Sequence, residues 1–236
     1  QMCAKDWDNI NFNHVPSVAA ARYKKAFARH TPKYAEYATK LAAGDKDVKI
    51  NAAAVYPYDV LKGVVGAYGM NYGKAELDVL VAQWDALPNY VGDASILPIV
   101  DVSGSMTCKA GGHTSKSQTT CLDVSVSLGL YLADKNKGVF KDTFLTFSGK
   151  PQLVTLKGNI LQKVQQLSES QWEMNTNLHA AVQKVLDVAV KAKAPQEDMP
   201  AMLLILSDMQ FDQCARYDDS AIQMIRRKYE EAGYRM

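Results

Sequence analysis

The apolar and polar positions of the chain follow two patterns, and the change between them falls near residue 92. Before it, apolar residues recur at intervals of three and four, the spacing of one helix face, and prolines and glycines interrupt the runs. Ser17 is placed to cap the first helix, and Pro32 suits the first turn of the second. This pattern predicts helices over residues 17–29, 32–43, 57–67 and 73–87.

After a predicted linker at residues 87–95, short aliphatic runs alternate with helix-like segments, which is typical of parallel βαβ units. The runs predict strands over residues 96–101, 142–147, 152–156 and 201–207, and helices over residues 119–134, 158–167, 176–192 and 218–232. We therefore expect an α/β fold, with a Rossmann-like, doubly wound, mostly parallel sheet in residues 92–236 and a helical domain in residues 1–91. Ligands of such sheets bind beyond the carboxyl ends of the strands.

Composition and charge exclude little. Lys and Arg number 27 against 25 Asp and Glu, a net charge of +2, which does not indicate a nucleic-acid or membrane partner. No apolar run reaches the roughly 18 residues that cross a bilayer. The four cysteines include no CxxC pair, so reduced thiols and a cytoplasmic location are expected. A zinc site from Cys108, His113 and Cys121 is an alternative, although their spacing matches no common zinc pattern.

The stretch Asp101-Val102-Ser103-Gly104-Ser105 directly follows the first predicted strand. Alternating side chains place the oxygens of Asp101, Ser103 and Ser105 on one side, and oxygen ligands suit Mg²⁺ or Mn²⁺. Thr176 and Asp208 follow elements that end at the same edge of the sheet, so they are candidates for the rest of the site. The alternative is structural: the serines satisfy backbone groups of a turn, and Thr176 caps a helix.

The Asp-x-Ser-x-Ser motif, with Thr176 and Asp208, resembles the metal-ion-dependent adhesion site of von Willebrand factor A domains. The resemblance implies that Ser103, Ser105 and Thr176 bind the metal directly and that Asp101 and Asp208 act through water. It also implies that an Asp or Glu carboxylate of a protein partner completes the coordination. Two departures are Ser207-Asp208-Met209, where the family has Thr-Asp-Gly, and Asn175, where it has glycine. The family fold also has two more strands and a last helix, so we expect a truncated sheet, or one that another segment completes.

Residues 10–61, which begin INFNHVPSVAAARYKK, are similar to the helical part of an uncharacterised family in plants, microbes and viruses that carries a C-terminal A domain. That arrangement is distantly similar to Ro (TROVE) ribonucleoproteins. The similarity implies RNA as an alternative partner and a virion as an alternative location. Aromatic residues interleave the basic positions and could stack on bases, although helical spacing also suits a core. The candidate RNA-binding residues are Arg22, Lys24, Lys25, Arg29 and Lys33.

The same residues argue against catalysis. A serine nucleophile would need a base such as His113 or His179, and the G-x-S-x-G motif of serine hydrolases on open sheets does not occur around Ser103. Metal-dependent hydrolysis would favour several directly ligating carboxylates, whereas the candidate site consists mainly of hydroxyls. We therefore expect a binding module and not an enzyme.

Overall fold

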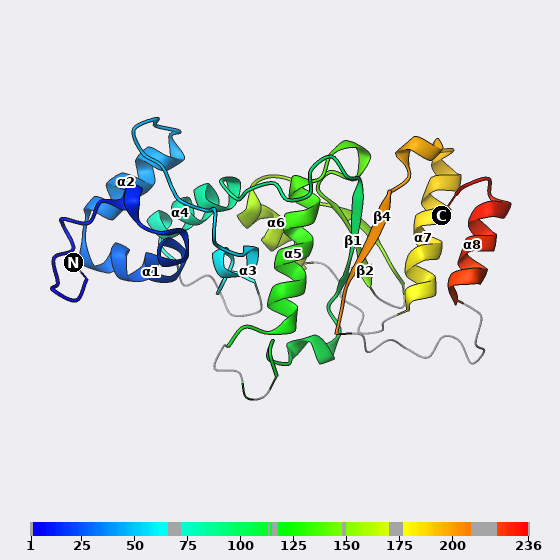
Figure 1. The fold of residues 1–236 in the computed structure, drawn as a ribbon, viewed down its shortest axis with the longest axis horizontal. Coiled ribbons are helices and arrows are strands. Elements are labelled where there is room, and N and C mark those ends of the chain that lie inside the picture. The colour runs from blue at the N-terminus through cyan, green and yellow to red at the C-terminus, as the bar shows by residue number, and fades with distance from the viewer. Residues whose placement is uncertain are drawn as a thin grey trace. The chain divides into compact units, whose positions relative to one another are not determined.

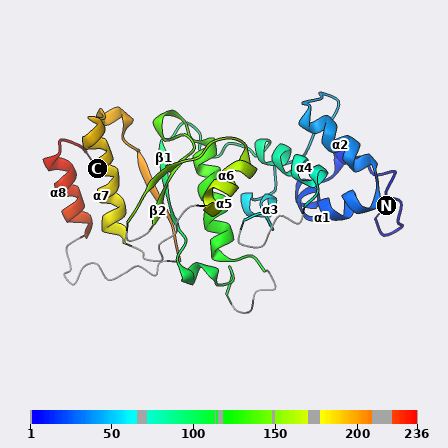
Figure 2. The ribbon, with the colours of Figure 1, turned by 180° about the vertical axis from the view of Figure 1, so that it is seen from behind.

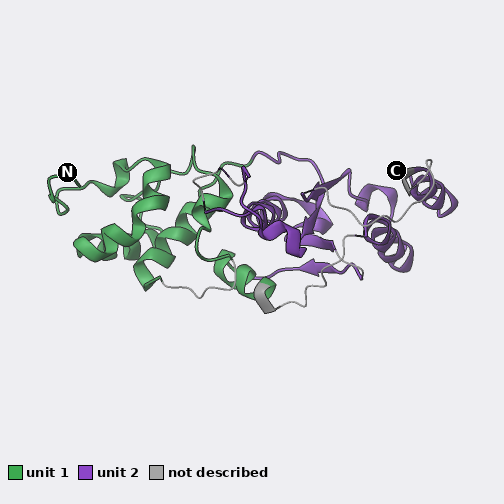
Figure 3. Cartoon of the chain, turned by 90° about the horizontal axis from the view of Figure 1, so that it is seen from below, with its two compact units in different colours: residues 1–89, 158–168 green, residues 90–157, 169–236 purple. Residues whose placement is uncertain are grey.

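The computed structural model describes residues 2–65, 72–112, 114, 118–147, 150–169, 177–208 and 221–235. The chain forms two compact units (Figure 3). The helical unit comprises residues 1–89 with 158–168, and the sheet unit comprises residues 90–157 with 169–236. The segment 158–168 groups with the helical unit, although the sequence pattern places it among the βαβ elements. Among the residues described, no helix is long and apolar enough to cross a membrane.

The helical unit is built around aromatic side chains. Its elements are a short 3-10 turn (Phe12–His14), α1 (Ser17–His30), α2 (Lys33–Ala42), α3 (Pro57–Val60), α4 (Lys74–Asp85) and most of α6 (Ile160–Glu169). The rings of Phe12 and Phe27 lie 5.4 Å apart, and those of Phe27 and Tyr34 lie 5.7 Å apart. Because large aromatic side chains bury much apolar area, this cluster contributes to the stability of the unit.

The predicted helix over residues 57–67 is wrong for residues 61–65, and its last two residues lie outside the described residues. Only Pro57–Val60 forms α3, and turns follow it. Gly63 has a φ of +78°, in the left-handed region that other residues rarely adopt, so the helix cannot continue through it. A side chain at residue 63 would also approach the Tyr72 hydroxyl to 2.9 Å.

The described strands of the sheet unit form one mostly parallel sheet. They are β1 (Ile96–Asp101), β2 (Thr143–Phe147), β3 (Leu153–Thr155) and β4 (Met202–Leu206), in the order β3-β2-β1-β4. β1 is parallel to both β2 and β4, whereas β3 is antiparallel to β2. The predicted α/β class and mostly parallel sheet are therefore confirmed.

Helices cover both faces of this sheet (Figures 1 and 2). α5 (Cys121–Lys135) lies on one face, and α7 (Leu178–Ala192), against which α8 (Ala221–Glu231) packs, lies on the other. Leu97 and Ile99 join the core on the α7 side. On the α5 side, a Cβ at Gly129 would lie 2.4 Å from Val100 Cγ2, so glycine permits the close approach of α5 to β1.

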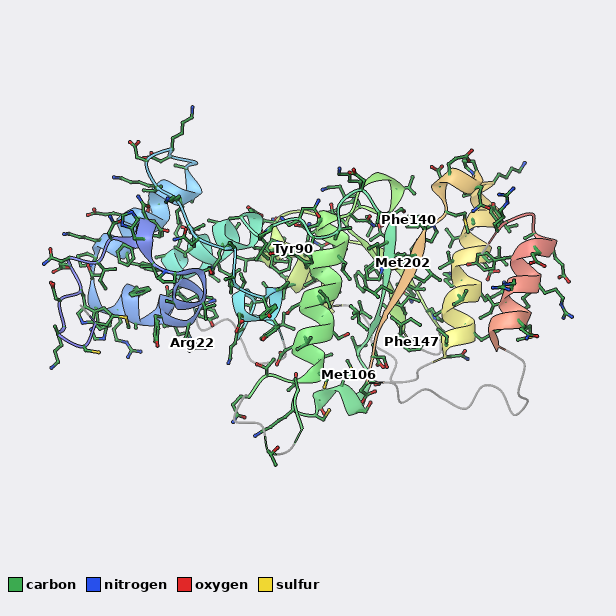
Figure 4. The ribbon with its side chains drawn as sticks, viewed as in Figure 1. Arg22, Tyr90, Met106, Phe140, Phe147 and Met202 are labelled. Carbon is green, nitrogen blue, oxygen red and sulfur yellow. The ribbon has the colours of Figure 1, made fainter. Side chains whose placement is uncertain are left out.

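The parallel strands bring their carboxyl ends to one edge of the sheet. In Figure 4, Phe147 at the end of β2 and Met106 just after β1 lie at that edge, whereas Phe140 and Met202, which precede or begin strands, lie at the opposite edge. The chain passes from β1 to β2 on one side and reaches β4 on the other, so the strand order reverses between β1 and β4. Asp101 therefore stands at the point where ligands of open α/β sheets commonly bind.

Candidate metal centre

Asp101, the last residue of β1, is fully buried, and its carboxylate accepts hydrogen bonds at both oxygens. Its Oδ1 accepts a hydrogen bond from the Ser103 backbone N–H at 2.9 Å, which shapes the turn after β1. Its Oδ2 accepts one from the Ser207 hydroxyl, just beyond β4, at 2.5 Å. Both carboxylate oxygens thus accept hydrogen bonds from residues just beyond the two strands that flank the switch point.

The hydroxyls of Ser103 and Ser105 lie beside this carboxylate. Ser103 is 7% exposed and Ser105 is half-buried, and their Oγ atoms are 3.0 Å apart. The 3-10 turn that begins at Gly104 and includes Ser105 sets this spacing. Neighbouring ligands in an octahedral Mg²⁺ shell, with bonds of about 2.0–2.1 Å, lie about 3 Å apart. The two hydroxyls therefore stand at the separation that two adjacent ligands of one ion require.

Ser125 of α5 contacts the backbone at the ends of β1 and β4. Its hydroxyl lies 3.2 Å from the carbonyl oxygen of Asp101 and 3.0 Å from that of Leu206, and it donates between them. Neither Ser125 nor Ser207 was among the site residues predicted from the sequence. The position of Ser207 directly after an aliphatic strand could have indicated it, and so could a buried serine within the apolar stretch of α5.

Two thiols meet beside the amino terminus of α5. The Sγ atoms of Cys108 and Cys121 are 3.5 Å apart, and the Cys121 N–H donates to the Cys108 carbonyl at 2.9 Å. Burial raises the pKa of the Cys121 thiol, and its hydrogen bond with Cys108 and the charge of nearby Asp208 act in the same direction. Of the alternative zinc ligands, the structure joins these two, while His113 lies outside the described residues.

The structure thus brings together three of the predicted metal ligands, Asp101, Ser103 and Ser105. Asp208 follows Ser207 at the end of β4, at the same edge of the sheet. Thr176 lies outside the described residues. The capping role considered for Thr176 belongs to Asn177, whose side chain accepts from the Ala180 N–H at 2.9 Å, because α7 begins at Leu178 and not at residue 176.

The donor set suits a hard cation better than a soft one. Within the described ranges, no group of three or more His, Cys, Asp and Glu side chains is placed to hold a metal. The cluster at Asp101 is instead one carboxylate with several hydroxyls, which are oxygen ligands of the kind that Mg²⁺ and Mn²⁺ accept. None of the described Lys or Arg side chains forms an ion pair with Asp101, so a cation at this site would compensate a buried negative charge.

Most of the aromatic residues that interleave the predicted RNA-binding residues pack inside the helical unit, whereas Tyr23 is 38% exposed. Phe27, Tyr34 and Tyr37 are core residues, which confirms the packing alternative for them. Lys24 is buried, and the Lys33 ammonium donates to the Asp8 carbonyl at 2.7 Å. Arg22, Lys25 and Arg29 are exposed.

The fold and site define a mixed α/β protein with an oxygen-rich cluster at the switch point of its sheet. The chain belongs to the family described as a domain of unknown function (DUF7788), which matches residues 95–236. Residues 1–97 match a second domain of unknown function (DUF2828). The chain is also 31% identical to the uncharacterized protein L728 of Acanthamoeba polyphaga mimivirus, over 99% of the chain. It spans 41% of the length of that relative.

Proposed function

We propose that this chain is a divalent-cation-dependent binding module. Ser103, Ser105 and Thr176 would hold Mg²⁺ or Mn²⁺ directly, and Asp101 and Asp208 would hold it through water. The bound cation would supply an electrophilic centre for an external carboxylate, and the partner would be a protein that presents an Asp or Glu side chain. The observation that carries the proposal is the 3.0 Å separation of the Ser103 and Ser105 hydroxyls beside a buried carboxylate.

The charge of the site supports a cation. A fully buried carboxylate is costly unless it is hydrogen-bonded or paired with positive charge. Asp101 has hydrogen bonds at both oxygens. These bonds orient the carboxylate without neutralising it, so negative charge remains where the hydroxyl oxygens converge.

The topology supports the likeness to von Willebrand factor A domains. The order β3-β2-β1-β4 corresponds to the first part of the order 3-2-1-4-5-6 of doubly wound sheets, except that β3 runs antiparallel. The Asp-x-Ser-x-Ser turn occupies the switch point of this sheet, where an adhesion site would be expected.

Ligand choice follows from the hydroxyl-rich shell. Neutral hydroxyls donate less negative charge than carboxylates, so a cation held mainly by them keeps more of its charge for a further ligand. This property favours capture of a partner carboxylate over activation of a water held by several carboxylates. We therefore propose binding and not hydrolysis.

Isothermal titration of the chain with Mg²⁺ and with Mn²⁺ tests the metal site. We expect binding at a single site, weakened at least tenfold, or about 1.4 kcal/mol, in Ser105→Ala. Ser95→Ala, the same substitution at the amino end of β1, is the matched control and should bind like the unaltered chain. Failure of both ions to bind, or equal binding by Ser105→Ala, would refute the proposal.

Fluorescent peptides with a central Asp or Glu test the partner. Binding should require Mg²⁺, disappear with EDTA, and disappear when Asn or Gln replaces the acidic residue. Peptide binding that survives EDTA, or that does not distinguish Asp from Asn, would contradict capture through the metal.

A further inference from the structure

A pocket of about 430 Å³ opens in the helical unit between α1, α3 and the turn after α3. Among the described residues that line it, four are basic, Arg22, Lys24, Lys25 and Lys62, and one is acidic, Asp59. Arg22, Lys25 and Lys62 are exposed, whereas Lys24 is only 4% exposed. Figure 4 marks Arg22 on α1. The lining therefore combines three solvated positive charges with a buried one.

Lys24 is the unusual member of this group. Its ammonium carries three N–H donors, but among the described residues it has one hydrogen-bond acceptor, the Val60 carbonyl at 3.0 Å. It also lies 4.9 Å from the centre of the Tyr72 ring. Burial and, to a smaller extent, the charge of Lys25 lower the pKa of Lys24 to about 8, while the charge of Glu76 opposes the change. The site thus holds a positive charge that the protein compensates only in part.

The aromatic wall of the pocket is held in place. The Tyr72 hydroxyl donates to the Lys62 carbonyl at 2.7 Å, and the Lys25 ammonium lies 4.4 Å from the centre of the Tyr72 ring. Only a glycine at residue 63 leaves room for that hydroxyl. These contacts place the Tyr72 ring beside both lysines at the pocket.

We propose that this pocket binds a small phosphate-bearing molecule, with the phosphate on Lys24, Lys25 and Arg22. A phosphate offers several acceptor oxygens and negative charge, which would satisfy the donors of Lys24 and relieve the repulsion between neighbouring lysines. The volume lies within the roughly 300–1,000 Å³ of small-molecule sites. This site is separate from the proposed metal centre and does not depend on it.

Titration calorimetry with inorganic phosphate, AMP and adenosine tests the pocket. Phosphate and AMP should bind, and adenosine should not. Lys24→Met and Lys25→Met should each weaken AMP binding at least fivefold, whereas Lys40→Met, at an exposed lysine of α2 that does not line the pocket, should leave it unchanged. Because Lys25 is exposed, its variant tests the site even if Lys24→Met alters the fold, which circular dichroism would show.

Three results would overturn this assignment. The first is failure of phosphate and AMP to bind at millimolar concentration, and the second is equal AMP binding by Lys25→Met and the unaltered chain. The third is binding of a single-stranded RNA without binding of phosphate or AMP, which would assign the basic residues to an extended nucleic-acid surface and not to a pocket.

The thiols of Cys108 and Cys121 carry a second inference, independent of the pocket. Backbone hydrogen bonds pair their two segments on both sides of the antiparallel Lys109–Thr120 bridge, so the cysteines stand opposite each other. Opposite residues of such pairs have Cα atoms about 4.5–5.5 Å apart, within the roughly 4.4–6.8 Å that a disulfide spans. The sulfurs, 3.5 Å apart, need only a small movement to bond.

We infer that Cys108 and Cys121 form a disulfide by exchange with an oxidised thiol compound such as oxidised glutathione. The exposed Cys108 sulfur, as thiolate, attacks the reagent's sulfur–sulfur bond and releases one reduced thiol. The Cys121 sulfur then attacks Cys108 in the mixed disulfide, loses its proton and releases the second thiol. Two electrons pass to the reagent, and the new bond closes the loop that follows Ser105.

Alkylation and peptide mass spectrometry after treatment with oxidised glutathione test this step. A peptide pair that joins Cys108 to Cys121 should appear, while Cys3 stays open to alkylation or carries a single glutathione. Cys3→Ser should not change the crosslink, and Cys108→Ser should abolish it and leave Cys121 without an intramolecular bond. A Cys108 that persists as a glutathione adduct, or that pairs with Cys3 or Cys214, would overturn the inference.

Discussion

Asp101 in the sheet unit and Lys24 in the helical unit are both buried charged side chains, but their surroundings compensate them differently. Both oxygens of Asp101 accept hydrogen bonds from donors just beyond β1 and β4. The ammonium of Lys24 has one described carbonyl and the face of Tyr72, and its pKa is lowered to about 8. Two hydrogen-bond donors orient the Asp101 carboxylate, whereas burial is the main reason that the pKa of Lys24 is lowered.

The two regions consequently imply ligands of opposite sign. A buried carboxylate beside converging hydroxyls favours a cation, and a buried ammonium beside other bases favours an anion. Each proposal can therefore be tested through the stability of its own unit, because a ligand that binds only the folded chain stabilises it.

The largest expected effect is that of Asp101→Ala. It removes the acceptor for the buried Ser103 N–H and one hydrogen bond of the half-buried Ser207 hydroxyl, and a buried donor left unsatisfied costs about 1–3 kcal/mol. We expect the free energy of unfolding to fall by about 3 kcal/mol in urea denaturation followed by circular dichroism, and added Mg²⁺ to have no effect. A loss below about 1 kcal/mol, with Ser95→Ala as control, would show that this carboxylate does not hold the strands together.

The next effect is a pH dependence that originates at Lys24. Its pKa is about 8 in the folded chain against 10.5 in the unfolded chain, so the unfolded state binds more protons between these values and stability rises with pH. Between pH 7 and 9.5 we expect the Lys24 contribution to the free energy of unfolding to increase by about 2 kcal/mol. The window ends there because Tyr37, whose pKa burial raises to about 12, acts in the opposite direction at higher pH.

Lys24→Met isolates this contribution. As pH rises, the free energy of unfolding of the unaltered chain should increase relative to that of Lys24→Met. The reason is that the variant has no ammonium to deprotonate. A difference that stays constant across the window would mean that the ammonium is better compensated than its contacts indicate.

A smaller effect is expected from the cation. Mg²⁺ at ten times its dissociation constant should raise the free energy of unfolding of the unaltered chain by about 1.4 kcal/mol. Ser105→Ala should show less than half of this rise at the same Mg²⁺ concentration. An equal rise in both chains would place the bound cation elsewhere.

The smallest effect is that of Ser125→Ala. Its hydroxyl bridges two carbonyls at the ends of β1 and β4 but is not a proposed ligand, so we expect a loss of about 1 kcal/mol in urea denaturation. Mg²⁺ titration should still show binding within about threefold of the unaltered chain, or about 0.6 kcal/mol. Complete loss of Mg²⁺ binding would show that Ser125 positions the site and does not merely support the sheet.

The sequence predicted most elements because periodicity records which face is buried. β1 was predicted over its observed residues, and α1 and α5 within about two residues at each end. The helix over residues 57–67 failed because the pattern of apolar residues continues past Gly63, while the backbone there does not remain helical. Lys24 was predicted only as a candidate RNA-binding residue, because its contacts with α3 and Tyr72 join residues distant in sequence.

By itself, the sequence determined that an aspartate and two serines alternate at the end of a buried strand, since strand geometry and the motif are both local. Only the tertiary structure decided that Ser207 donates to that carboxylate and that Ser125 donates to the carbonyl oxygen of Asp101. It also decided that Cys108 faces Cys121 and that Lys24 lies in a basic pocket. These contacts join residues separated by many positions, and their distances depend on how strands, helices and turns pack. The local pattern of apolar and polar residues does not predict that packing.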